Sequence, residues 1–257
     1  MDLGIQNRIA LILGGTKGLG FSCAKFLHAS GARVILNGRD PDQGEAATQQ
    51  LPGSSFIAGD IGQEAARDKL TRNIARIGPP DIIVTNAGGP PAGPFEDSDI
   101  KAWRECYETN VLGPLEIVRA FLPSMKSNGF GRIINITSFV VKELYPNMAL
   151  SNSLRVGLTG AMGSLAKEVA PFGITINNIL PGLMDTDALK RVITNRAKRE
   201  GISEDEVKLN MANSVPMQRL GTVDDFGFAC VFLSSKHAAY ITGQNICIDG
   251  GLTKSVI

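Results

Sequence analysis

The stretch Ile9-Ala10-Leu11-Ile12-Leu13-Gly14-Gly15-Thr16-Lys17-Gly18-Leu19-Gly20 decides the fold of this chain. Its first five residues form an apolar run, which is typical of a parallel strand buried on both faces. The glycines that follow allow a tight turn and let backbone amides approach a pyrophosphate. The helix expected from Leu19 then offers its N-terminus to that anion. In this strand-to-helix setting the run predicts a dinucleotide-binding turn.

Short apolar runs alternate with longer helical stretches along the rest of the chain. We expect strands at 9–13, 33–37, 54–58, 81–85, 132–136, 174–179 and 244–248, and helices at 19–30, 42–50, 64–76, 100–126, 150–169 and 223–233. Strand-helix alternation with short connections predicts an α/β Rossmann fold. The expected architecture is a single domain over 1–257, built on a doubly wound, seven-stranded parallel sheet with helices on both faces.

Composition excludes several classes of function. The chain has 257 residues, 43% hydrophobic and 20% charged, with a net charge of +1, so nothing favours nucleic acid or an anionic membrane as a partner. The four cysteines have no metal-ligand spacing, and we expect them to be reduced and mostly buried, with no metal site. Neither a signal region nor a membrane-spanning apolar run is present, so we expect a cytoplasmic protein.

The spacing of Gly14, Gly18 and Gly20 resembles the short-chain dehydrogenase/reductase family, whose pattern is Thr-Gly-x-x-x-Gly-x-Gly. Leu13 stands where the family pattern has Thr, so this chain lacks the threonine hydroxyl at that position. Further landmarks similar to the family follow in order: Gly59-Asp60-Ile61, Thr85-Asn86-Ala87-Gly88, Asn110, Pro181-Gly182 with Thr186, and Asp249-Gly250-Gly251. The resemblance covers almost the whole chain.

This resemblance implies a set of cofactor-binding residues. They are Gly14, Thr16, Lys17, Gly18, Leu19, Gly20, Asn37, Arg39, Asp60, Ile61, Asn86, Ala87, Gly88, Arg155, Pro181, Gly182 and Thr186. Cofactor choice follows from charge, because an NAD-selective site places a carboxylate at the end of the second strand. Here that end reads Asn37-Gly38-Arg39, and Lys17 and Arg39 suit a 2′-phosphate. We therefore expect NADP(H) in preference to NAD(H).

The resemblance also places four positions at the chemistry, and two of them depart from the family. Asn110 and Ser138 are present, whereas Ser151 and Arg155 stand where the family carries Tyr and Lys. A phenol can be pulled toward neutrality by a nearby cation, but an aliphatic hydroxyl is far too weak an acid. The chain resembles a branch of 3-oxoacyl-acyl-carrier-protein-reductase-like members with this imperfect tetrad. Ser151 can still donate a hydrogen bond, and Arg155 can still hold the nicotinamide ribose.

Two residues between Ser138 and Ser151 are candidates for the missing acid. Lys142 can project toward the substrate, and a partly desolvated lysine can act as an acid. Tyr145 would have to fold back to do so. For both, the alternative is an ordinary loop residue. We include Lys142 with Ser138, Asn110, Ser151 and Arg155 as the candidate catalytic set.

The family's substrate-specific region corresponds to a charged stretch, and we expect a lid at about 183–214. Its basic residues Arg191, Arg196, Lys198 and Arg199 either lie on a solvated helix or meet an acidic carrier or phosphorylated substrate. The resemblance further implies a homo-oligomer, a dimer or tetramer, through the stretches 100–126 and 150–169. The expected partner is a small-molecule or acyl-carrier-linked substrate.

Three functions remain open on the sequence. The first is an atypical NADPH-dependent carbonyl reductase, or its reverse alcohol oxidation, on a ketoacyl-like substrate. The second is a non-catalytic NADP(H)-binding protein. The third is an enone reductase, in which hydride goes to carbon and the enolate needs only polarisation. Neither the substrate nor the direction of reaction can be derived from the residues.

Overall fold

Seven parallel strands form one sheet in the order β3-β2-β1-β4-β5-β6-β7 in the computed structural model, which describes residues 1–255. The strands are β1 (Ile9–Ile12), β2 (Arg33–Gly38), β3 (Ser55–Ala58), β4 (Ile82–Thr85), β5 (Gly131–Ile136), β6 (Ile174–Pro181) and β7 (Asn245–Ile248). The expected doubly wound parallel sheet is confirmed. The strand order reverses between β1 and β4, and in such sheets ligands bind in the crevice at that point.

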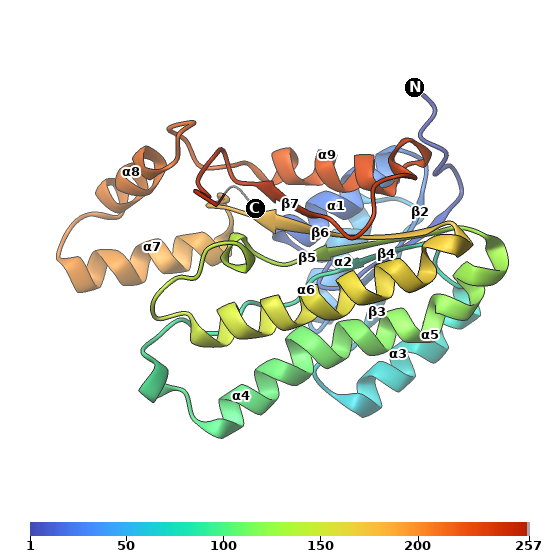
Figure 1. Cartoon of the computed structure of the whole chain (residues 1–257), viewed down its shortest axis with the longest axis horizontal. Coiled ribbons are helices and arrows are strands. Elements are labelled where there is room, and N and C mark those ends of the chain that lie inside the picture. Colours follow the sequence, from blue (N-terminus) through green and yellow to red (C-terminus); the bar gives the residue numbers. More distant parts are fainter. Residues whose placement is uncertain (256–257) are drawn as a thin grey trace.

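Helices cover both faces of this sheet (Figure 1). α1 (Gly18–Ala29), α2 (Pro41–Gln50) and α9 (Val223–Ser234) lie on one face. α3 (Glu64–Ile77), α5 (Gly113–Asn128) and α6 (Ala149–Val169) lie on the other. Short 3-10 turns, η1 (Phe95–Asp97), η3 (Phe139–Val141), η4 (Ala170–Phe172) and η5 (Lys236–Ala238), complete the connections.

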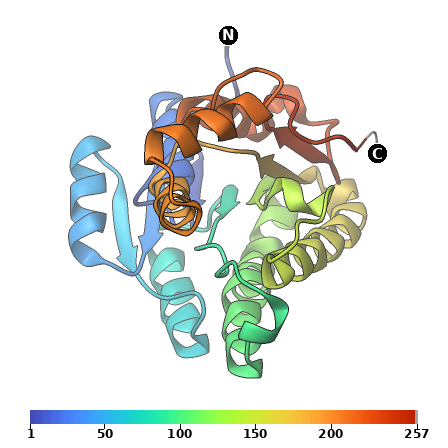
Figure 2. The same cartoon turned by 90° about the vertical axis from the view of Figure 1, so that its left-hand side faces the viewer.

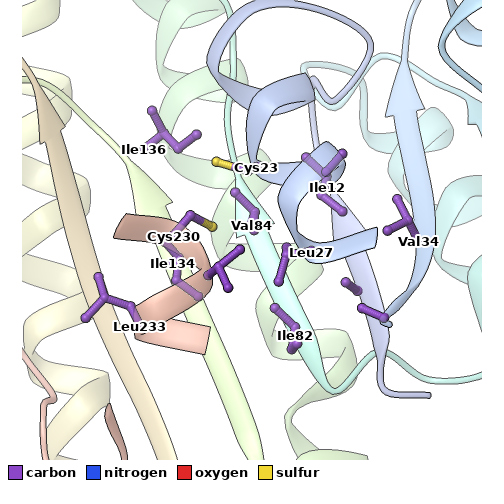
Figure 3. Close-up of a cluster of buried hydrophobic side chains, with 14 of the residues drawn as sticks. Ile12, Cys23, Leu27, Val34, Ile82, Val84, Ile134, Ile136, Cys230 and Leu233 are labelled. Carbon is purple, nitrogen blue, oxygen red and sulfur yellow. The ribbon is translucent and has the colours of Figure 1, made fainter. Parts of the chain in front are cut away.

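The core is two apolar layers separated by the sheet. Ala10 and Ile12 of β1 belong to the layer under α1 and α9, whereas Leu11 and Leu13 belong to the layer under α3, α5 and α6. This division follows from the alternation of side chains along a strand. Figure 3 shows the first layer, where Cys23 of α1 and Cys230 of α9 lie among aliphatic side chains. A hydrogen bond with Cys230, together with burial, raises the pKa of the Cys23 thiol well above its ordinary value.

The long helical stretch predicted over 100–126 is present, but it contains a π-helical turn. α4 (Ile100–Tyr107) passes into the π-turn η2 (Glu108–Leu112), and α5 begins at Gly113. Asn110, at the centre of that turn, donates from Nδ2 to the carbonyl of Cys106 at 3.1 Å. Single π-turns inside helices occur frequently at functional sites.

Two helices lie apart from the two layers, beyond the carboxyl ends of the strands. α7 (Asp187–Glu200) and α8 (Glu204–Ser214) project there, as Figures 1 and 2 show. They share a small apolar cluster of their own, which includes Ile193 and Val207. Within residues 1–255, no helix combines the length and apolar character needed to cross a membrane.

Candidate active site

An open cleft of about 760 Å³ lies at the carboxyl ends of the strands. Its lining comes from the turns that follow β1, β2, β3, β4, β5 and β6, with additional residues from α4, η2, α6 and α7. Segments far apart in the sequence meet here because parallel strands bring all their carboxyl ends to one edge of the sheet. The cleft therefore occupies the crevice that the strand order predicts.

The turn after β1 exposes an uncapped helix N-terminus to this cleft. Gly14 and Gly18 have positive φ angles of 55° and 58°, which favour glycine. A Cβ on Gly18 would meet no atom within 4 Å, whereas one on Gly20 would lie 2.3 Å from the carbonyl oxygen of Gly14. Lys17 precedes α1 without a capping side-chain hydrogen bond. The first amides of α1 are thus available to a pyrophosphate, which fits a dinucleotide.

Most of the predicted cofactor-binding residues line the cleft. They are Gly14, Thr16, Lys17, Gly18, Leu19, Asn37, Arg39, Asp60, Ile61, Asn86, Ala87, Gly88, Arg155, Pro181 and Thr186. Gly20 and Gly182 are not in the lining, and tight packing accounts for their residue type. A Cβ on Gly182 would lie 2.6 Å from Cβ of Asp249.

The end of the cleft beside β2 is cationic. Lys17 and Arg39 line it with exposed side chains, and Asn37 is buried, donating to the carbonyls of Ile57 and Gly59 at 3.1 Å. Asp40 is the nearest carboxylate. It caps α2 by accepting from the amides of Asp42 and Gln43 and from Nε2 of Gln43 at 2.7 Å. Its hydrogen-bonding capacity is thus directed to the helix, which leaves the two cations to set the local charge.

Arg155 lies on the floor of the cleft under the ends of β5. Its Nη1 donates to the carbonyls of Thr137 at 2.6 Å and Ile136 at 3.3 Å. Within residues 1–255 no carboxylate pairs with it, and its Nε is buried without a partner. Burial lowers the pKa of this guanidinium to about 10, so it stays charged at neutral pH. A half-buried, incompletely satisfied cation that lines a cleft fits an oxygen-rich anionic ligand.

Three of the predicted catalytic residues, Ser138, Lys142 and Ser151, lie outside the cleft lining. Ser151 precedes Arg155 by about one turn of α6 and is buried, with 4% of its surface exposed. Ser138 follows β5 and its Oγ accepts from the amide of Val140 at 3.4 Å. Asn110, in contrast, does line the cleft with Arg155.

Lys142 follows the turn η3 and lies outside the cleft lining. Burial raises the pKa of the Cys247 thiol, and the positive charge of Lys142 acts weakly in the opposite direction. Next to it, Glu143 accepts from the amide of Lys254 at 3.1 Å. The ring of Tyr145 does fold back, packing edge-to-face on Phe139 with centroids 5.1 Å apart.

Several cleft residues have no recognisable signal in the sequence. They are Gln43, Glu105, Cys106, Thr109, Thr137, Asp187, Ala188 and, as part of the site, Arg191. Glu105, Cys106 and Thr109 lie within about one turn of Asn110, so the helical period could have identified them once Asn110 was chosen. Asp187, Ala188 and Arg191 share one face of α7. Of the basic residues in the segment where we expect a lid, Arg196 and Arg199 pair with Glu200, and Arg191 lines the cleft.

Comparison with known proteins identifies the family. The family model described as enoyl-(acyl carrier protein) reductase matches residues 14–253. The NADPH-dependent reductase BacG of Bacillus subtilis is 29% identical, over 98% of this chain and 100% of that protein. The 3-oxoacyl-[acyl-carrier-protein] reductase FabG of Haemophilus influenzae is 34% identical, over 96% of this chain and 99% of that protein.

A solved structure agrees with these relatives. L-sorbose reductase from Gluconobacter frateurii, complexed with NADPH and L-sorbose, matches with a TM-score of 0.94 at 26% identity and covers 100% of both chains. The fold, the glycine turn and the sequence relatives lead to one conclusion. The chain belongs to the short-chain dehydrogenase/reductase family of oxidoreductases.

Proposed function

We propose that this protein is an NADP(H)-dependent oxidoreductase that transfers hydride to or from a carbonyl or alcohol carbon of a ketoacyl-like substrate. The observation that carries the proposal is the charge at the adenosine end of the cleft. Lys17 and Arg39 line that end, while the carboxylate of Asp40 is engaged in capping α2. A dianionic 2′-phosphate fits this arrangement better than a ribose hydroxyl, which prefers a free carboxylate.

The cofactor, when bound, supplies or accepts the hydride. The protein's own residues then bind the cofactor and polarise the substrate oxygen. The amides at the start of α1 hold the pyrophosphate, and Arg155 contributes fixed positive charge beside the ribose. Ser138 and Ser151 donate hydrogen bonds to the substrate oxygen, which stabilises the charge that develops there. Asn110 lines the cleft and would hold the water that delivers the proton, whereas Lys142 lies outside the cleft lining.

Cofactor preference and turnover test this proposal separately. We expect tighter binding of NADPH than of NADH in fluorescence titrations, and NADPH oxidation with 3-oxoacyl thioesters or related ketones. Arg39→Ala should weaken NADPH binding by roughly tenfold, the value of one charge-assisted hydrogen bond, and leave NADH binding unchanged. Arg33→Ala is the matched control, because Arg33 is exposed at the opposite end of β2. If the protein binds NADPH but no ketone causes its oxidation, the protein is a non-catalytic NADP(H)-binding protein.

Reduction of an enone is the second candidate function. The matching family model is described as enoyl-(acyl carrier protein) reductase, which favours hydride addition to the β-carbon of a double bond conjugated to the carbonyl, followed by protonation of the enolate at its α-carbon by water. Ser138 and Ser151 can polarise an enone carbonyl without a titrating acid at position 151. Parallel assays with an enone and the corresponding saturated ketone separate the two reactions. Faster NADPH oxidation with the enone would favour this second candidate.

We also propose a cytoplasmic homo-oligomer, a dimer or tetramer. Apolar side chains remain exposed on α9, where Phe228 is 62% and Phe232 48% exposed. On α6, a Cβ on Gly157 or Gly160 would meet no atom within 4 Å, so that face is open to close helix packing. Light scattering on the purified protein measures the oligomeric state, and a monomer at micromolar concentration would contradict the proposal.

A further inference from the structure

A buried arginine outside the cleft connects three separate segments. Arg67 of α3 has a side chain only 4% exposed. Its Nη1 donates to the carbonyl of Ile61 at 2.8 Å and lies 3.0 Å from Oε2 of Glu108. Its Nε donates to Oε2 of Glu116 at 2.5 Å, and Nη2 to Oε1 at 3.4 Å. One guanidinium thus bridges the nucleotide loop (Asp60–Gly62), the π-turn η2 and helix α5.

The nucleotide loop and the π-turn also touch directly, with no spare room between them. A Cβ on Gly62 would lie 2.5 Å from Oγ1 of Thr109, and one on Gly113 would lie 2.6 Å from the carbonyl oxygen of Ile61. Both segments then contribute to the cleft: Asp60 and Ile61 from the loop, Thr109 and Asn110 from the turn. A movement of either segment must therefore move the other or break the Arg67 contacts.

The ion pairs that Arg67 makes with Glu108 and Glu116 strengthen the link between the nucleotide loop and the π-turn. Burial alone would lower the pKa of Arg67, but its hydrogen bonds and attraction to Glu116 and Glu108 outweigh burial and raise it. A guanidinium in this setting keeps its charge and presents a planar fork, so each edge has a defined acceptor. Glu116 occupies one edge in a bidentate fashion. Nη1, at the other edge, has its own partners, the carbonyl of Ile61 and the carboxylate of Glu108.

We propose that Arg67 is a positioning residue that couples nucleotide binding at the Asp60–Gly62 loop to the ordering of the π-turn that carries Asn110. The coupling rests on the proposed function, since it requires an adenosine phosphate in the cleft. It assigns Glu108 and Glu116 different roles. Glu108 links the π-turn to the guanidinium, whereas Glu116 ties the guanidinium to α5 and makes no contact with the π-turn through it.

Hydrogen exchange on the full chain tests the coupling without any need for turnover. The probe is 2′,5′-ADP, which carries the adenosine and the 2′-phosphate but no nicotinamide. Glu108 and Glu116 are a matched pair, with side chains 40% and 41% exposed, so replacing either leaves the protein folded. We expect 2′,5′-ADP to slow exchange of the amides of 108–113 by roughly tenfold in the unmodified protein and in Glu116→Ala. In Glu108→Ala that protection should be lost.

Three other outcomes of the hydrogen-exchange experiment would overturn the proposal. Equal behaviour of the two glutamate variants overturns the coupling, because an ion-pair cluster with a merely structural role would not distinguish them. Arg67→Lys serves as a second variant, since lysine keeps the charge but cannot bridge two segments with a planar fork. It should bind 2′,5′-ADP and still lose protection over 108–113, and retained protection overturns the proposal. Absence of 2′,5′-ADP binding by the unmodified protein overturns the proposed NADP(H) site and the coupling together.

Discussion

Two arginines, Arg67 fully buried and Arg155 half-buried, lie near the same edge of the sheet, and their surroundings are opposite. Arg67, beneath the nucleotide loop, has a carbonyl and two carboxylates as partners, and its pKa is raised. Arg155, on the floor of the cleft, donates only to backbone carbonyls, and burial lowers its pKa to about 10. The protein therefore neutralises one charge itself and leaves the other for a ligand.

The difference teaches where to look for a binding site in a fold of this kind. A buried cation with complete protein partners holds segments together, whereas one without a counter-charge raises the energy of the empty site. A phosphate- and hydroxyl-rich ligand recovers that energy on binding. Variants of Arg67 and Arg155 test this distinction between an arginine with carboxylate partners and one without.

The largest effect is expected from converting the Arg155 region to the family's Tyr and Lys. The double variant Ser151→Tyr with Arg155→Lys places a phenol one helical turn before an ammonium. Because a nearby cation lowers the pKa of a phenol, this pair restores a matched proton donor. Turnover of ketones should rise by about 10²–10⁴-fold, measured as NADPH oxidation.

Single variants separate the contributions in that experiment. Arg155→Lys alone should leave ketone turnover within a few-fold of the unmodified protein, since the acid is still missing. Enone turnover, which needs only polarisation, should change little in the double variant. Ser151 is buried, so thermal denaturation must first show that the tyrosine is accommodated. A folded, NADPH-binding double variant with no gain would contradict the assignment of these two positions.

The next largest effect is expected from replacing Arg67, the arginine that pairs with two carboxylates. Arg67→Met should lower the free energy of unfolding by about 2–3 kcal/mol, because Glu108 and Glu116 lose their shared counter-charge and Ile61 loses a donor. Chemical denaturation of the nucleotide-free protein measures the change. An unchanged unfolding free energy would mean that the network contributes nothing to the fold.

Replacing Arg155, the arginine without a carboxylate partner, should change the free energy of unfolding in the opposite direction to Arg67→Met. Arg155→Met removes a half-buried charge that pairs with no carboxylate of residues 1–255, so the nucleotide-free protein should gain about 1 kcal/mol in unfolding free energy. At the same time the Kd for NADPH should rise by roughly tenfold, as a charged donor to the ligand is lost. Denaturation and fluorescence titration give the two values. A loss of stability similar to that of Arg67→Met would erase the distinction between the arginines.

The smallest effect concerns an arginine whose pair is exposed. Arg219 donates to Asp225 at 2.8 Å, and Asp225 also caps α9 with Thr222. These contacts lower the pKa of Asp225 from 3.8 to about 2. A depressed carboxyl pKa stabilises the fold above the unfolded value, and this contribution is lost as the pH falls from 4 through 2.

Both side chains of this pair are well exposed, so solvent screening leaves only about 0.5 kcal/mol. Asp225→Asn should lower the melting temperature slightly at pH 7 and have no effect at pH 2. A pH-independent difference would point to the helix cap instead of the ion pair.

The sheet and the glycine turn could be predicted because each follows from short-range patterns. The apolar run from Ile9 to Leu13 has the length and composition of a buried strand, and the positive φ angles of Gly14 and Gly18 explain why glycine stands there. Placing Arg155 and Asn110 at the cleft needed the family resemblance as well. Both do line it.

The rest depends on contacts between distant residues and on side-chain rotamers. Nothing in the pattern of α3 marks Arg67, because its partners Glu108 and Glu116 are more than forty positions away. The π-turn over Glu108–Leu112 contains neither glycine nor proline, so no local signal interrupts the helical period. Likewise Glu143 accepts from the amide of Lys254 only because the C-terminal segment packs against the loop after Ser138.

The π-turn makes the length of this helix a property that the site depends on. A π-turn holds one residue more than an α-turn, so deleting one residue from 108–112 would allow α4 and α5 to join as one regular helix. Because either kind of turn completes about one rotation, α4 would keep its face toward the cleft while α5 keeps its contacts with the sheet through Ile117, Val118 and Phe121. Glu105 and Cys106 would stay in the cleft, and the backbone that carries Asn110 would change. A single-residue deletion in 108–112 would therefore act on the position of Asn110 and leave the rest of that wall in place.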